Sequence, residues 1–301
     1  MRLGTSTIHT VWNNAIPPVA TVVPDSEITI ETLDAGGGQL DETSTAEAVE
    51  SIDLDRVNPV TGPLAVEGVR AGDVLIIDVL DVEVGSWGWT ANIPGFGLLA
   101  DDFPDAHLRV STIDRNLAEP LSGIGVPVVP MIGTIGVAPP EPGEHSVIPP
   151  RQWGGNMDIR HVGPGARLIL PVGVDKALLS LGDVHAAMGD GEICGTGVET
   201  PATVQLRVGV AHGPAPRTPM IETDPGSQRT GAALATTGIG PDLMTATKDA
   251  ARALIEAIVK RTGLDPVDAY LLASITGDLK ISEVVDAPNW IVSAHFPMDL
   301  L

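Results

Sequence analysis

Prolines and glycines recur along most of this chain and leave few long uninterrupted segments. The 301 residues include 26 prolines and 34 glycines, and seven of the prolines lie between residues 127 and 150. Proline is excluded from helix interiors and from the central strands of a sheet. Short strands joined by turns produce such a profile, whereas a bundle of long helices does not. We therefore expect a β-rich protein in which residues 127–150 form a shaped loop system around one short strand.

Six segments have the apolar runs or the apolar–polar alternation that is typical of strands. They are residues 20–34, 73–84, 131–138, 166–174, 177–187 and 201–211. The polar, glycine-rich residues 35–52 predict a loop with one helical turn at most. Residues 86–105 also predict a loop. It carries Trp87, Trp89 and Phe96, which either line a pocket or pack in the interior.

The pattern changes after about residue 215. Residues 218–241 read as loop and short strand, and residues 242–262 predict a helix that ends at Gly263. The apolar face of this helix is expected to comprise Met244, Ala251, Leu254, Ile255, Ile258 and Val259.

Asp265 followed by Pro266 signals the start of a second helix, and two strands follow at residues 279–286 and 290–296. The expected organisation is a β-rich body over residues 1–215. A smaller α/β part over residues 216–301 is expected to pack on it.

The charge of the chain limits its partners. The formal net charge is −22, so the surface repels nucleic acid and anionic membranes, and neither is an expected partner. No stretch approaches the ~18 continuous apolar residues of a membrane span. The first 18 residues lack the apolar core of a signal peptide. A cytoplasmic location is therefore expected.

Residues 182–199, with the sequence GDVHAAMGDGEICGTGVE, concentrate ionisable and metal-seeking side chains among five glycines. These side chains are Asp183, His185, Asp190, Glu192, Cys194 and Glu199. Carboxylates and imidazole are typical ligands of zinc and similar ions. Asp183 and His185 lie two apart at the expected end of a strand, so both can face one ion. Glu192 and Glu199 could close the coordination shell, although such carboxylates can also cap turns.

A second cluster lies in residues 153–161, WGGNMDIRH, which contain Asn156, Asp158 and His161. Asn156 and Asp158 could present their oxygens to one side as part of a site, or they could form a local Asx turn. His145 lies beside Glu144 in the proline-rich loop, where a lone histidine is more often solvated than functional.

Cys194 is the only cysteine, so the chain can form no intrachain disulfide. Negatively charged glutamate neighbours oppose the formation of a reactive thiolate, which favours a structural role. The sequence also lacks a GxSxG elbow, a phosphate-binding loop and a dinucleotide-binding fingerprint.

Several blocks of the sequence resemble the acetamidase/formamidase family of amide hydrolases. They begin with HTVWNNAIPPVATV, GDVLIIDVLDVE and PMIGTIGVAP. The two most specific are HSVIPPRQWGGNMDIRHVGPGARLILPV and LGDVHAAMGDGEICGTGVE. The resemblance implies a mainly β fold, namely a jelly-roll-like β-sandwich body with a smaller α/β C-terminal part, assembled as a homo-oligomer (a dimer or larger). It also implies hydrolysis of small aliphatic amides to ammonia and a carboxylate, with a divalent metal, zinc first, and with calcium as an alternative structural ion.

The same resemblance carries functional roles onto residues of the two specific blocks. Asp158, Asp183 and His185 are expected to bind the metal, and Glu199 to bind it or to orient a ligand. Glu192 is the expected general base. Asn156 is expected to hydrogen-bond the substrate amide or the oxyanion.

Two alternatives remain open at this point. In the first, the protein is a cysteine amidase in which Cys194 is the nucleophile and Glu192 is the base. In the second, it is a metal-stabilised protein that binds a small polar ligand without reaction.

Overall fold

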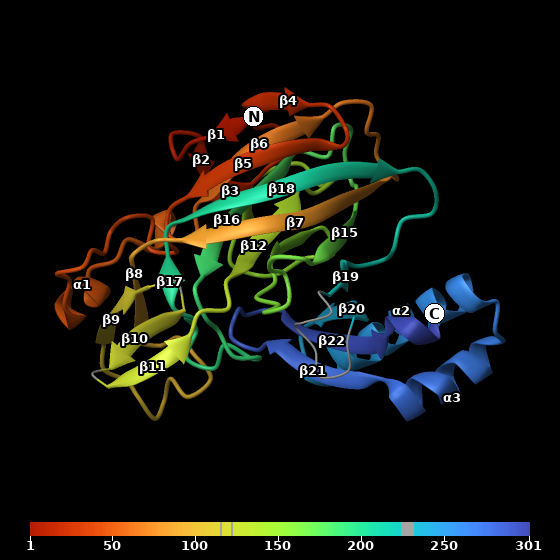
Figure 1. The fold of residues 1–301 in the computed structure, drawn as a ribbon. Coiled ribbons are helices and arrows are strands. Elements are labelled where there is room, and N and C mark those ends of the chain that lie inside the picture. Colours follow the sequence, from red (N-terminus) through yellow and green to blue (C-terminus); the bar gives the residue numbers. More distant parts are fainter. Residues whose placement is uncertain (115, 122, 224–231) are drawn as a thin grey trace.

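Two large, mostly antiparallel sheets dominate the computed structural model (Figure 1), which describes residues 1–114, 116–121, 123–223 and 232–301. Counted over these residues, the first sheet has nine strands. In spatial order they are β1 (Arg2–Leu3), β5 (Ser26–Thr32), β18 (Ala202–Ala211), β7 (Val74–Val84), β15 (Arg167–Pro171), β19 (Met220–Glu222), β20 (Ala233–Gly240), β22 (Trp290–Pro297) and β21 (Asp278–Glu283).

The second sheet has eleven strands over the same residues. Eight of them run in the order β11 (Ile124–Pro127), β10 (Leu117–Leu121), β9 (His107–Ile113), β8 (Trp87–Asn92), β17 (Glu199–Thr200), β16 (Leu179–His185), β12 (Met131–Val137) and β14 (Gly154–Asn156). The other three are β6 (Val60–Val66), which pairs with β16, and β2 (Ile8–His9) and β4 (Ala20–Val22), which pair with β6. A separate pair joins β3 (Val11–Trp12) to β13 (His145–Ser146).

The two sheets share one hydrophobic core. The first sheet contributes Ile77 and Leu206, and the second contributes Ile132 and Leu181, all of them fully buried. Each such side chain contributes about 1.5–3 kcal/mol through the burial of its apolar surface. The predicted mainly β fold with a sandwich body is therefore confirmed.

The C-terminal strands β20, β22 and β21 continue the first sheet, and two helices pack beside them (Figure 1). The helices are α2 (Leu243–Thr262) and α3 (Pro266–Thr276), close to their predicted bounds. The Asp242 carboxylate accepts a hydrogen bond from the N–H of Thr245 at 2.8 Å, and Gly263 ends α2 with a φ of 74°. Because the first sheet runs through both parts, the division of the chain near residue 215 stays a prediction.

The buried face of α2 differs from the predicted one at its first turn. Met244 was expected in the apolar face but is 62% exposed. Ala246, Ala250, Leu254 and Ile258 are buried and belong to one cluster with Phe296 of β22. Small alanines let the helix backbone approach the sheet closely, so the contact face begins at Ala246 and leaves Met244 in solvent.

Residues 86–105 are not the continuous loop that was predicted. Their first part forms β8, which pairs with β9 from Trp87 opposite Thr112 to Asn92 opposite His107. The alternation of Trp87, Trp89 and Ala91 has the period of a strand. Residues 35–52 contain the single short helix α1 (Ala46–Glu50), as predicted.

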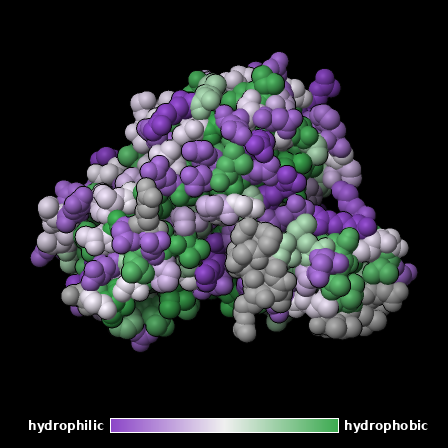
Figure 2. All heavy atoms as spheres, in the orientation of Figure 1, coloured by the Kyte–Doolittle hydropathy of each residue, from purple (hydrophilic) through white to green (hydrophobic). Residues whose placement is uncertain are grey.

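The face drawn in Figure 2 carries hydrophilic side chains over much of its area, interspersed with hydrophobic ones. Hydrophobic side chains gather at the lower left of that view, where Figure 1 places β10 and β11. Leu117, Leu121 and Ile124 are exposed in these strands. Among the described residues, no helix is both long enough and apolar enough to cross a membrane.

A buried histidine in β22 makes the stability of the fold depend on pH. Burial, together with the positive charge of Lys280 and the neighbouring His161, lowers the pKa of His295 to about 3. The unfolded chain protonates this side chain below a pH of about 6.5, whereas the folded chain does so only near pH 3. The contribution of His295 to stability is therefore complete above pH 6.5 and is lost progressively as the pH falls.

Between pH 7 and pH 5, we expect the wild type to lose about 2 kcal/mol more unfolding free energy than a His295→Gln variant. Denaturant titrations of both proteins at the two pH values measure this difference. An equal loss in the two proteins would contradict the prediction.

Candidate metal and catalytic site

Neighbouring strands of the second sheet bring the predicted site residues together. Asp183 and His185 lie at the end of β16, and His185 pairs with Glu199 of β17. On the other side of β16, β12 pairs with β14, which ends at Asn156. Asp158 follows two residues later. Strand order thus joins two sequence clusters that are separated by more than twenty residues.

The Nε2 atom of His185 lies among three carboxylates. It is 3.2 Å from Asp183 Oδ1, 3.2 Å from Glu199 Oε2 and 3.8 Å from Asp158 Oδ1. The side chains of His185, Asp158 and Glu199 are each 1% exposed. The Nδ1 atom of the ring lies 3.2 Å from the sulfur of Met188.

Glu192 reaches the same centre from the loop after β16. Ligand atoms of Asp158, His185 and Glu192 lie within 4.8 Å of one another, as do those of Asp183, His185 and Glu199. The loop is fixed from outside, because the N–H of Gly191 donates to the carbonyl of Ser282 at 3.0 Å. The two triplets share His185 and describe one compact cluster.

Three of these acidic residues have unusual backbone dihedral angles. The φ angles of Asp158, Asp183 and Glu192 are 44°, 53° and 45°. Positive φ is unfavourable for residues with a side chain and persists where the surroundings enforce it, which is common at functional sites. The strain therefore supports a functional reading of all three residues.

The carboxylates of the cluster are buried, and their negative charges repel one another. Burial raises the pKa of Asp158, Glu192 and Asp286 well above the usual range, and the neighbouring carboxylates raise it further. Burial raises the pKa of Glu199 to about 7, against the opposing charge of His185.

Among the residues that the structure describes, the ring of His185 is the one side chain of the cluster that can carry a positive charge. Burial lowers the pKa of His185, but the carboxylates of Glu199 and Asp183 outweigh this and hold it well above its usual range. Burial alone would raise the pKa of Asp183. The charge and the hydrogen bond of His185 outweigh burial and hold this pKa below its usual value. One imidazolium cannot neutralise all these acids, so the cluster favours additional positive charge.

Unpartnered oxygens show where such a charge fits. Both carboxylate oxygens of Asp158 are buried without a hydrogen-bond donor among the described residues. A buried carboxylate oxygen without a partner is costly unless a cation balances it. One nitrogen and several oxygens form a donor set that suits a divalent ion. The residues present therefore fit a metal ion.

Asn156 is held on both sides of its amide. Its Oδ1 accepts a hydrogen bond from Thr134 Oγ1 at 2.5 Å, and its Nδ2 donates to Asp286 Oδ2 at 2.6 Å. The Thr134 hydroxyl also donates to Asp183 at 3.1 Å. Asn58 donates to both Asn156 and Asp183 at 3.4 Å.

Sequence reasoning did not find Thr134, Asn58, Glu283 and Asp286. Asp286 is 3% exposed and reaches the site from the C-terminal part of the chain. Its N–H, like that of Val285, donates to the Glu283 carboxylate. Thr134 shows only as a polar residue in an apolar strand, and the segment around Asp286 matches no metal or catalytic motif.

Three other candidate residues lie outside the cluster. His161 packs edge-on against His295, with ring centroids 5.0 Å apart, and its Nε2 lies 3.0 Å from Lys280 Nζ. His145 bonds to the carbonyl of Glu141 at 3.1 Å. Cys194 is half-buried, and its sulfur lies 3.4 Å from the carbonyl of Thr196.

A cavity of about 340 Å³ opens onto the cluster. Asp158, Asp183, Glu192 and Glu199 line it, whereas Cys194 does not. Trp89 and Phe96 also line it, whereas Trp87 does not. Trp87 and Trp89 both belong to one hydrophobic cluster beside the cavity.

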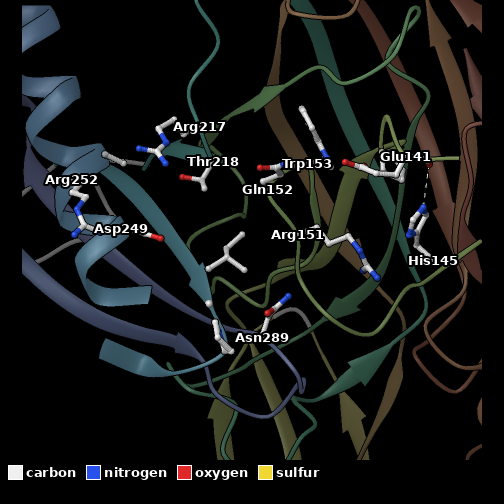
Figure 3. Close-up of a pocket in the computed structure, with 15 residues that line it drawn as sticks. Glu141, His145, Arg151, Gln152, Trp153, Arg217, Thr218, Asp249, Arg252 and Asn289 are labelled. Atoms are coloured by element: carbon white, nitrogen blue, oxygen red, sulfur yellow. Dashed lines mark hydrogen bonds and ion pairs between the residues drawn. The ribbon is translucent and has the colours of Figure 1, made fainter. Parts of the chain in front are cut away.

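A larger cavity of about 480 Å³ lies elsewhere, between α2 and the proline-rich loop (Figure 3). Its basic residues are Arg151, Arg217 and Arg252, and His145 lies at its edge beside Glu141 (Figure 3). None of the clustered carboxylates lines this space. The acidic cluster, rather than cavity size, identifies the candidate site.

The sequence matches the acetamidase/formamidase family over residues 2–145 and 142–301. It is 30% identical to a formamidase of Methylophilus methylotrophus, in a match covering 67% of this chain and 64% of the relative. It is 29% identical to an acetamidase of Mycolicibacterium smegmatis, covering 68% of this chain and 66% of the relative. The matched region thus spans just under two thirds of each of these two relatives.

A solved structure gives a more complete match. An acetamidase from Bacillus halodurans superposes with a TM-score of 0.92 at 35% identity, over 98% of this chain and 97% of that one. Sequence match, fold and the two specific sequence blocks agree, and the chain belongs to the acetamidase/formamidase family.

Proposed function

We propose that this protein hydrolyses primary amides to ammonia and a carboxylate at the acidic cluster, with a divalent metal ion bound there. The observation that carries the proposal is the position of His185 Nε2 among Asp183, Glu199 and Asp158, the last with both oxygens unpartnered. The relatives that the chain resembles include a formamidase and an acetamidase.

Zinc is the ion we propose, held by Asp158, Asp183 and His185, with Glu199 as a further ligand or as the group that orients His185. Both triplets of candidate ligands include His185. A nitrogen ligand favours zinc over calcium, which prefers oxygen ligands alone. Calcium elsewhere in the protein remains the alternative as a structural ion.

When bound, a divalent ion polarises the amide carbonyl and lowers the pKa of a water molecule. Glu192 is proposed to accept a proton from the attacking water and to pass it to the amide nitrogen, which leaves as ammonia. The acyl carbon gains the water oxygen, and the resulting carboxylic acid releases its remaining proton to solvent or to ammonia and leaves as the carboxylate.

Asn156 is proposed to donate its amide N–H to the substrate oxygen. Its hydrogen bonds to Thr134 and Asp286 fix the orientation of that amide. A fixed donor does not have to reorganise as negative charge develops on the substrate oxygen. For this reason Asn156 would stabilise the transition state.

The experiment is ammonia release from formamide and acetamide, measured on protein dialysed against a chelator and then supplied with zinc. We expect activity to be lost on chelation and restored by zinc. Turnover that ignores the chelator would contradict the metal-dependent mechanism.

A Cys194→Ser variant in the same assay separates the alternatives. We expect it to retain activity, because the thiol does not line the site cavity. Loss of turnover in this variant, with no effect of the chelator, would favour a cysteine amidase. Saturable amide binding without ammonia release would favour a binding protein.

Self-association is a further part of the proposal. Leu117, Leu121 and Ile124 leave apolar surface exposed on β10 and β11, and contiguous apolar surface often marks an interface. We propose a homo-oligomer in the cytoplasm, without nucleic acid or membrane as a partner because of the charge of −22.

A further inference from the structure

The site cavity is larger than the simplest amides require. Its volume is about 340 Å³, whereas an apolar cavity of about 150 Å³ already holds benzene. A water molecule takes up roughly 30 Å³ of liquid volume, so an ion and a few waters leave most of the cavity for substrate. Formamide or acetamide would fill only a small part of that remainder.

The lining divides into two chemical groups that come from different parts of the chain. The carboxylates come from the strands and loops between residues 158 and 199 and from Asp286. The apolar group comes mainly from two other segments and includes Ile52, Val57, Trp89, Ile93, Phe96 and Ile148. An acyl group without polar atoms can remove this apolar surface from water, which is favourable.

The apolar group lies directly beside the reacting centre. Val57 precedes Asn58, whose amide donates to Asn156 and Asp183 at 3.4 Å. The ring of Phe96 lies against Gly195, so closely that a side chain on that glycine would meet it. The N–H of Gly195 in turn donates to the carbonyl of Glu192 at 2.7 Å. A substrate with its amide on the carboxylate cluster therefore has its acyl group within reach of Val57 and Phe96.

The charge of the cavity excludes acyl groups that carry a negative charge. The described residues that line it include no lysine or arginine, and five of them are aspartates or glutamates. A carboxylate or a phosphate on the acyl group would lie near these acids, and no cationic side chain among the described lining residues could pair with it.

We infer that the substrate is a primary amide with an uncharged apolar acyl group of at least the bulk of a benzene ring. Trp89, Val57 and Phe96 are the residues that select it. This inference rests on the proposed amide hydrolysis at the same site.

Ammonia release is measured for acetamide, isobutyramide and phenylacetamide with the zinc-loaded full-length protein. An extra methylene in an apolar pocket changes kcat/KM by about 10-fold or more. We therefore expect kcat/KM to rise along this series, with phenylacetamide about 100-fold above acetamide. A series in which acetamide has the highest kcat/KM would overturn the inference.

Val57→Trp fills the apolar part of the cavity, and Leu98→Trp is its matched control. Leu98 is 54% exposed and does not line the cavity. We expect Val57→Trp to lower the ratio of the phenylacetamide to the acetamide kcat/KM by about 10-fold or more, and Leu98→Trp to leave it unchanged. An unchanged ratio in folded Val57→Trp would also overturn the inference.

Calorimetric titration with phenylacetamide separates failure of this inference from failure of the proposed function. If no amide releases ammonia but phenylacetamide still binds, and Val57→Trp weakens that binding, the hydrolysis is wrong and the apolar pocket is supported. If acetamide is hydrolysed but phenylacetamide neither binds nor reacts, the hydrolysis stands and the inference is wrong.

Discussion

A Glu192→Gln variant is expected to keep its metal and to lose about 10²–10⁴-fold in kcat. The amide of glutamine is close to isosteric with the carboxylate, so the loop around Glu192 and its contacts with Asp158 and His185 are preserved. Glutamine cannot accept and return a proton, however, so the water and the leaving nitrogen lose their proton carrier. Ammonia release and elemental analysis of the zinc content measure the two properties separately.

Asp190→Asn is the matched control for this variant. Asp190 lies in the same loop, forms a 4.0 Å ion pair with Arg160 and does not line the site cavity. We expect its kcat and zinc content to stay close to those of the wild type. A Glu192→Gln protein with wild-type kcat would remove Glu192 from the mechanism, and loss of zinc would make Glu192 a ligand instead.

A Gly133→Ala variant is expected to lose zinc and to lose about 10²-fold or more in kcat, although no functional group is removed. A methyl group on Gly133 would lie 2.7 Å from Asp183 Oδ2 and would also meet Asp158 Oδ1. It would also lie 2.8 Å from the backbone carbonyl oxygen of Asp183, so both aspartates would have to shift from their positions around His185. Added volume at a packed site costs about 1–3 kcal/mol of stability, so a folded protein is expected.

Gly189→Ala is the control for this substitution, since a methyl group there has no other atom within 4 Å. Zinc content, kcat and thermal unfolding of the two variants are compared with those of the wild type. Full zinc content and kcat in Gly133→Ala would show that the positions of Asp158 and Asp183 do not govern the site.

The sequence predicted the fold well where side-chain period decides the structure. Val204, Leu206 and Val208 alternate with more exposed residues in β18, and Leu254 and Ile258 lie one turn apart in α2. It failed at β8, although Trp87, Trp89 and Ala91 alternate with the period of a strand, and it failed at Met244. In both cases pairing or packing with a distant segment decided the outcome, and local pattern carries no information about that partner.

The sequence indicated several residues of the candidate site, but it did not indicate all of them. Asp183 and His185 could be paired from their spacing on one strand, and Glu192 and Glu199 from their density nearby. That Asp158 joins them depends on β14, β12 and β16 being neighbours. Asp286 and Asn58 come from distant segments without a motif, and only tertiary structure brings them to Asn156.

The position of Asp286 has a consequence for the synthesis of the protein. The body strands that carry Asp158, His185 and Glu199 leave the ribosome well before residues 278–286. Asp286, which holds Asn156, and Ser282, which holds the Glu192 loop, are therefore added when most of the chain has already been made. A nascent chain can collapse around its sheets and still lack a working centre, so the appearance of activity marks the completion of folding rather than its beginning.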